Sequence, residues 1–193
     1  MSATARWRFA LGCGPMAEEI QPPGRPRPES GSGEDESRTA SHSSSLLVRW
    51  MGIADANSAG FVHGGTVMRL VDEAAGLAAI KHSGRRVVTA GMDRMTFLTP
   101  VFVGELLRCS SSVNAVWRTS MEVGVRVEAE NPFTGETRHT STAYLTMVAL
   151  EDGKPVAAPR LVTESDEELR RQREAEVRRA NRLAEREQIR GGR

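Results

Sequence analysis

The segment Asn57–Glu73, with the sequence NSAGFVHGGTVMRLVDE, decides the fold of this chain. A polar loop leads to a histidine, a glycine pair and a run of apolar residues with helical spacing. Backbone N–H groups at a helix N-terminus attract negative charge, so the Gly64-Gly65 pair suits an anion or a developing oxyanion. The helix also carries Asp72 beside Glu73, and a carboxylate in an apolar helix is costly unless something uses it. The segment therefore predicts a functional helix.

This helix is predicted to run from Gly64 to about His82, because the Ser83-Gly84 pair that follows is a typical helix end. Apolar residues occupy most of its faces: Val67, Leu70, Val71, Ala74, Ala75, Leu77, Ala78 and Ile80. A helix that is apolar nearly all round is a buried one.

The rest of the central chain is predicted to form β-strands. One precedes the helix, from Leu46 to Met51, and the others follow it: Val87–Met92, Met95–Leu98, Leu106–Trp117, Met121–Glu130 and Thr137–Leu150. In Met121–Glu130, one apolar face alternates with a polar face of Glu122, Arg126, Glu128 and Glu130. The order of strand, buried helix and then antiparallel strands predicts an α+β architecture in which a sheet wraps one helix.

Both ends of the chain differ in composition from this domain. Residues 1–44 are predicted to be a disordered tail, because Pro, Gly, Ser and charged residues dominate residues 17–45. Residues 45–162 form the predicted domain, and residues 163–193 are predicted to be a charged, solvated helical tail. Weak packing of this helix on a neighbouring subunit is the alternative.

The overall composition excludes several classes of protein. The 193 residues carry a formal net charge of +1, which argues against a nucleic-acid partner, and no apolar run is long enough for a membrane span. Cys13 and Cys109 are expected to be unpaired thiols, and the four histidines show no metal-ligand spacing, so no metal is predicted. We expect a cytoplasmic protein, with a transit peptide or a later start at Met16 as alternatives for the basic N-terminus.

Three segments resemble one known family: ANSAGFVHGGTVMRLVDEAAGLAA, RRVVTAGMDRMTFLTPVFVGELL and MEVGVRVEAENPFTGETRHTSTAYLTMVAL. They are similar to the hotdog-fold acyl-CoA thioesterases, above all the cytosolic, brain-type acyl-CoA hydrolase group and its single-domain bacterial relatives. The resemblance covers roughly residues 45–162. It implies a homodimer with active sites at its interface, a hexamer as a trimer of dimers, and a CoA thioester as substrate without a cofactor.

The resemblance also implies site residues. Asn57 and, fifteen positions later, Asp72 match the family's catalytic pair, and Gly64 or Gly65 matches its backbone oxyanion donor. Gly65 and Asp72 lie about 10 Å apart along a helix axis, so one thioester carbonyl cannot readily touch both in the same chain. We therefore expect a composite site, with the helix start and Asn57 from one subunit and Asp72 from the other. Asp72 is the expected general base or nucleophile, and Asn57 positions water or the carbonyl.

Each candidate has a structural alternative. Asp72 could face solvent, Asn57 could be a turn residue, and His63 could cap the helix rather than contact substrate or donate a proton. Glu73 lies about 100° round the helix from Asp72, which favours a structural role. Arg94, Arg118 and Arg138 are candidate contacts for the CoA phosphates.

The predicted function is hydrolysis of fatty acyl-CoA to free fatty acid and CoA. One alternative is a hotdog 3-hydroxyacyl-thioester dehydratase, in which His63 would act as the base. The other is a non-catalytic acyl-CoA-binding protein, although binding alone does not require a carboxylate near the thioester.

Overall fold

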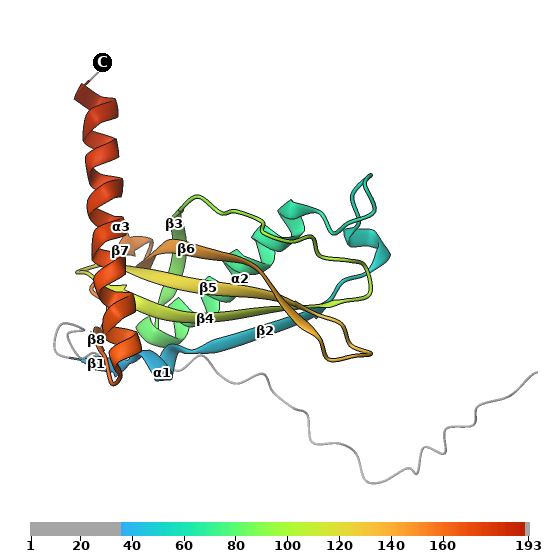
Figure 1. Ribbon diagram of the computed structural model, residues 1–193. Coiled ribbons are helices and arrows are strands. Elements are labelled where there is room, and N and C mark those ends of the chain that lie inside the picture. Colours follow the sequence, from blue (N-terminus) through green and yellow to red (C-terminus); the bar gives the residue numbers. More distant parts are fainter. Residues whose placement is uncertain (1–35, 192–193) are drawn as a thin grey trace, which may run out of the picture.

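A computed structural model describes residues 36–191, and in it a curved antiparallel sheet wraps around one long helix (Figure 1). The sheet has the order β2-β4-β5-β6-β3, with β7 paired to the end of β6. These strands are β2 (Ser45–Trp50), β3 (Arg86–Met92), β4 (Leu106–Val116), β5 (Ser120–Glu130), β6 (Thr137–Glu151) and β7 (Lys154–Pro155). A parallel pair, β1 (Ser37–Thr39) and β8 (Arg160–Val162), lies outside this sheet.

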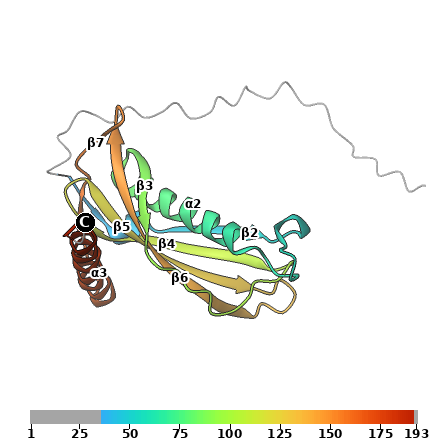
Figure 2. The ribbon, with the colours of Figure 1, turned by 90° about the horizontal axis from the view of Figure 1, so that it is seen from above.

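The central helix is α2 (Gly64–Ser83), as the sequence predicts. It ends at Gly84, whose φ of 64° is favoured by glycine, and the Gly84 N–H donates to the Ile80 carbonyl. Its buried face packs on the inner face of the sheet, including the wholly buried Val123, Val125 and Val127 of β5. Figure 2 shows α2 on one side of the sheet and α3 (Asp166–Gly191) on the other.

The second face of α2 differs from the prediction of a helix buried nearly all round. Met68, Leu77 and Ile80 are 42%, 44% and 47% exposed within a single chain. Val88, on the edge strand β3, is also exposed. Large apolar side chains gathered on one helix and an adjacent strand edge are typical of a surface that another protein covers.

Two further expectations are wrong. Residues 95–98 form a loop instead of a strand, because only the Leu98 N–H reaches a neighbouring strand, at the Thr140 carbonyl. Residues 36–44, assigned to the disordered tail, form β1 and the short helix α1 (Ala40–Ser43). Residues 1–35, which include the rest of that tail and Cys13, lie outside the described residues.

The C-terminal helix α3 is also more than a solvated tail. Its first half packs against the outer face of the sheet near the turn between β4 and β5, and its far end projects beyond the domain (Figure 1). Ala175 is buried there, and the Trp117 indole N–H donates to Glu176. The division of the chain at residues 44 and 162 stays a prediction.

His82 lies fully buried at the end of α2, where its Nε2 donates to the Pro159 carbonyl at 3.0 Å. Its Nδ1 has no hydrogen-bond partner within residues 36–191. Burial is the main cause that lowers the pKa of His82 below its usual value of 6.5, although the bond to Pro159 opposes it. The folded protein therefore holds this histidine neutral.

This burial predicts a loss of stability in weak acid. The pKa of His82 is lower in the folded than in the unfolded chain, so its contribution is complete above pH 6.5 and is lost as the pH falls below 6.5. We expect His82→Gln to flatten the dependence of the unfolding free energy on pH as the pH falls below 6.5. Urea unfolding over a series of pH values measures it, and His139→Gln, at a histidine that does not act on the pKa of His82, is the control. An unchanged slope in His82→Gln contradicts the assignment.

Candidate active site

Asp72 lies on α2 and accepts a hydrogen bond from the hydroxyl of Thr89, with 2.6 Å between Oδ1 and Oγ1. Asp72 is half-buried, and Thr89 is exposed within the single chain. A carboxylate held by one donor keeps its remaining lone pairs free to accept a proton or to attack. The pair therefore forms a fixed but accessible acid on the outer side of α2.

Thr89 reaches Asp72 by the ordinary alternation of β3, since it shares a face with Val87, which packs against the core, and pairs with the buried Met147. The register with β6 shifts between Thr89 and Gly91, so Ala90 forms a bulge in the edge strand. Bulges bend a strand and redirect its side chains, and they are frequent beside active sites. The sequence did not reveal Thr89, since a threonine in a strand is ordinary and nothing local marks its partner on the helix.

The start of α2 presents a backbone donor. His63 is the N-cap residue, and its Nδ1 accepts from the Gly65 N–H at 3.3 Å. The Gly64 N–H has no hydrogen-bond partner in the described part of the chain. The Phe97 ring lies 3.5 Å from the position that a Cβ on Gly64 would occupy. Of the two glycines, Gly64 therefore offers the free N–H, in a slot beside an aromatic ring.

Asn57 shapes the loop before the helix. Its Oδ1 accepts from the N–H groups of Ala59 and Phe61, at 2.9 and 3.2 Å. This is the turn role weighed above, yet it occupies only the oxygen. The side-chain amide Nδ2 keeps both of its hydrogens for a ligand.

The predicted residues gather at two places rather than one. Gly64 and Asp72 are eight residues apart on α2, about 12 Å along its axis. The side-chain hydrogen bonds of Asn57 stay within its own loop, and that of Asp72 goes to β3. One chain thus places two groups of candidate residues at different heights of the helix.

The other candidates have structural partners or lie exposed. Glu73 forms an ion pair with Arg69 one turn earlier on the exposed side of α2. Arg138 donates to both oxygens of Glu105 and lies over the Phe102 ring. Burial has the largest single effect and raises the pKa of Glu105, but the hydrogen bonds from Arg138 and from the Phe102 N–H, together with the charge of Arg138, lower that pKa overall. The guanidinium of Arg138 is therefore occupied by contacts within the fold.

Arg94 and Arg118 lie exposed on the surface. Arg94 is 97% exposed at its side chain, 4.0 Å from Glu185, and Arg118 is exposed near the turn between β4 and β5. They stay candidates for phosphate contacts.

The remaining reactive groups take no part in this site. Burial raises the pKa of the Cys109 thiol to about 12, so it stays protonated and inert. Residues 36–191 bring together no cluster of His, Cys, Asp and Glu able to hold a metal ion. Nor do they include a helix both long and apolar enough to cross a membrane.

Two clefts of about 630 and 880 Å³ lie between α3 and the outer face of the sheet. Neither is lined by Asp72, Thr89, Gly64 or Asn57. These clefts are therefore separate from the candidate residues on α2, the helix on which Met68, Leu77 and Ile80 are exposed within a single chain.

Known proteins resemble this chain in both fold and sequence. Residues 59–135 match the family described as the thioesterase superfamily. The uncharacterized acyl-CoA thioester hydrolase YkhA of Bacillus subtilis is 40% identical over 116 residues, which cover 60% of this chain and 67% of that protein. The chain therefore belongs to the thioesterase superfamily, and its fold is the hotdog fold expected from the sequence.

Two solved structures are especially similar. An apo-hexameric acyl-CoA thioesterase superposes with a TM-score of 0.75 at 37% identity, covering 78% of this chain and 97% of that one. An acyl-CoA hydrolase from Staphylococcus aureus, in complex with butyryl coenzyme A, coenzyme A and coenzyme A disulfide, has a TM-score of 0.71 at 33% identity, with coverages of 79% and 96%. Variants of that enzyme with alanine at an asparagine, an aspartate and a threonine have also been solved.

Proposed function

We propose that this protein hydrolyses acyl-CoA thioesters to a free fatty acid and CoA. The observation that carries the proposal is the Asp72 carboxylate, held by Thr89 at 2.6 Å on the open side of the central helix. Membership of the thioesterase superfamily and similarity to proteins named acyl-CoA thioester hydrolases support the same substrate class.

Spacing in the Staphylococcus aureus enzyme supports the choice of residues. The substituted asparagine precedes the substituted aspartate by 15 positions, and the substituted threonine follows that aspartate by 17. Asn57, Asp72 and Thr89 have the same spacings. Thr89 thus joins the pair inferred from the sequence.

In the proposed mechanism the two groups of candidate residues come from different subunits of a homodimer. The Gly64 N–H of one subunit stabilises the negative charge that develops on the thioester oxygen. The Nδ2 of Asn57 positions the carbonyl or the attacking water. Asp72 of the other subunit removes a proton from that water as the water attacks the carbonyl; the C–S bond then breaks, and CoA leaves and takes up the proton to give the free thiol. Alternatively, Asp72 attacks the carbonyl itself, CoA leaves as the thiolate, and water then hydrolyses the acyl–Asp72 anhydride to the free acid. The exposed apolar face of α2 and β3 supports such a dimer, and a hexamer as a trimer of dimers is part of the proposal.

His63 argues against the dehydratase alternative. A dehydratase base needs an unprotonated ring nitrogen, whereas Nδ1 of His63 accepts from the Gly65 N–H, and a neutral imidazole whose Nδ1 accepts carries its proton on Nε2. The proposal is tested by following thiol release from acyl-CoA of several chain lengths, together with hydration of crotonyl-CoA. We expect thiol release without hydration. Binding of acyl-CoA without thiol release at any chain length contradicts the proposal.

Thr89→Val is expected to lower kcat by about 10- to 100-fold. This is the change in rate that follows from losing the free energy of one hydrogen bond to a charged group. Valine keeps the shape of threonine but cannot donate to Asp72. Thr89→Ser keeps the hydroxyl and is expected to retain most of the activity. Steady-state kinetics on both variants measure this, and equal losses in the two would assign the effect to packing.

A further inference from the structure

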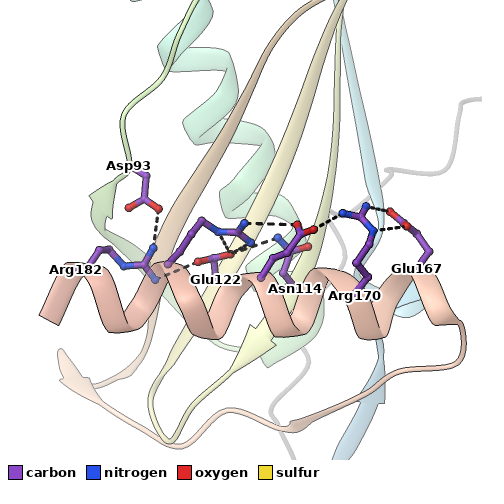
Figure 3. Close-up of polar contacts among 8 residues, drawn as sticks. Asp93, Asn114, Glu122, Glu167, Arg170 and Arg182 are labelled. Atoms are coloured by element: carbon purple, nitrogen blue, oxygen red, sulfur yellow. Dashed lines mark hydrogen bonds and ion pairs between the residues drawn. The ribbon is translucent and has the colours of Figure 1, made fainter. Parts of the chain in front are cut away.

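The carboxylate of Glu122 lies on the outer face of β5, where the alternation of the sequence predicts a polar surface, yet it is 0% exposed. Helix α3 covers it. Arg178 donates to Oε1 from Nη2 and Nε at 2.7 and 3.0 Å. Arg182 donates to Oε2 at 3.1 Å, and Figure 3 shows its side chain beside Glu122. A buried charge persists only when it is paired and hydrogen-bonded. Glu122 therefore fixes where α3 lies on the sheet.

Arg182 also reaches a second carboxylate. Its Nη1 lies 2.7 Å from Oδ2 of Asp93, the residue directly after β3 (Figure 3). The Asp93 N–H donates to the Tyr144 carbonyl at 2.9 Å, and the guanidinium of Arg178 lies 3.6 Å from the centre of the Tyr144 ring. The end of β3 is thus held at both its backbone and its side chain.

This anchor lies close to the candidate active site. Thr89 precedes Asp93 by four residues, and the bulge at Ala90 interrupts the ladder between them. Beyond the bulge only two register pairs with β6 remain, at Gly91 and Met92. Within one chain β3 is an edge strand with β6 on one side only. Thr89 is the last residue of β3 that pairs with β6 before the bulge, so whatever holds the strand after the bulge helps to keep its side chain against α2.

We propose that Arg182 and Asp93 are positioning residues for the active site. Glu122 orients Arg182, Arg182 holds Asp93, and Asp93 fixes the end of β3 so that the Thr89 hydroxyl stays on Asp72. The inference rests on the proposed thioesterase function and adds α3 to the catalytic unit. It assigns a role to a helix that the sequence marks only as charged and solvated.

Two variants break the anchor in different ways. Arg182→Gln removes the link from α3, while Asp93→Ala leaves both arginines on Glu122 and so keeps α3 in place. Each is expected to lower kcat between about tenfold and about 100-fold, the scale of small misplacements at a reacting group, with KM changed by less than about twofold. Arg179→Gln is the matched control, because Arg179 lies on the same helix over the Trp117 ring, and within residues 36–191 no hydrogen bond or ion pair joins it to β3. Its kcat is expected to equal that of the wild type.

Combining Arg182→Gln with Thr89→Val tests whether Arg182 acts through Thr89. If Arg182 acts through Thr89, Arg182→Gln has little further effect once the Thr89 hydroxyl is gone. An equal loss of kcat in both backgrounds would overturn the inference, as would wild-type kcat in both Asp93→Ala and Arg182→Gln.

Hydrogen exchange gives a readout that does not depend on catalysis. Amides of residues 86–93 are expected to exchange faster in Asp93→Ala and Arg182→Gln than in Arg179→Gln or the wild type. Equal exchange in all four proteins would show that the contact between Arg182 and Asp93 does not hold the end of β3. Failure of the proposed function is distinct, since it shows as absent thiol release by the wild-type protein.

Discussion

Asp72→Ala is expected to lower kcat for acyl-CoA hydrolysis by about 10²- to 10⁴-fold, the usual contribution of a positioned base. The side chain is half-buried on the open face of α2, and its one hydrogen bond comes from an exposed threonine. Its removal should therefore leave folding and assembly intact. Thiol release measures the activity, and sedimentation or scattering measures the oligomer.

Glu73→Ala is the matched control, since Glu73 is the next residue of the same helix and its ion pair within the described residues is with Arg69, on the surface of α2. We expect wild-type kcat within about twofold for this surface change. Near wild-type turnover by Asp72→Ala, or a comparable loss in Glu73→Ala, would contradict the role of Asp72.

The composite site makes a sharper prediction for mixtures of two inactive proteins. Asn57→Ala and Asp72→Ala chains that exchange subunits form mixed dimers in which one site lacks both groups and the other keeps both. Random pairing should restore about a quarter of wild-type activity, because half of the dimers carry one intact site. If both groups of each site came from the same chain, mixing would restore nothing.

The double variant Arg178→Ala/Arg182→Ala is expected to have the largest effect on stability. It leaves Glu122 buried without a cation, or forces α3 off the sheet so that water reaches the carboxylate. Removing the partners of a buried charge costs about 3–5 kcal/mol of unfolding free energy. Urea unfolding at neutral pH measures this, and limited proteolysis detects a released α3.

Adding Glu122→Leu to that double variant should recover part of the loss, because no buried charge then remains. The control removes two arginines from the same helix at exposed positions, Arg170→Ala/Arg173→Ala. Arg170 pairs with Glu167 and Glu174 of α3 itself, and exposed pairs of this kind are worth about 1 kcal/mol or less. Equal losses in the two double variants would mean that the burial of Glu122 does not matter.

The sequence predicted the parts of the molecule whose causes are local. Helix α2 follows from a run of spaced apolar residues between a glycine pair and Ser83-Gly84, and its observed bounds differ from the expected ones by one residue. The alternation in β5 placed Val123, Val125 and Val127 in the core. The membership of the superfamily followed from the same segments, and so did the choice of Asn57 and Asp72, which stays a prediction.

What the sequence missed depends on contacts between distant residues. Alternation puts Glu122 on the polar face of β5, but only the docking of α3, 56 residues later for Arg178, decides that this face is buried. Thr89 becomes notable only when the fold places β3 beside α2, so that its hydroxyl reaches Asp72, 17 residues earlier. The apolar pattern of α2 did not show which faces of the helix are buried within one chain and which face stays exposed.

The small parallel pair β1–β8 changes where the folded unit begins. Arg38 donates to the Lys81 carbonyl at the end of α2, and Ser41 donates to Glu164 just before α3. The N–H of Val113 in β4 donates to Ser43. A chain that begins at residue 45, the boundary set by composition, would lack the donor to the Lys81 carbonyl at the end of α2. It would also lack β1, the strand that pairs with β8. Shortened versions for expression or crystallisation should therefore keep every residue from 36 onward.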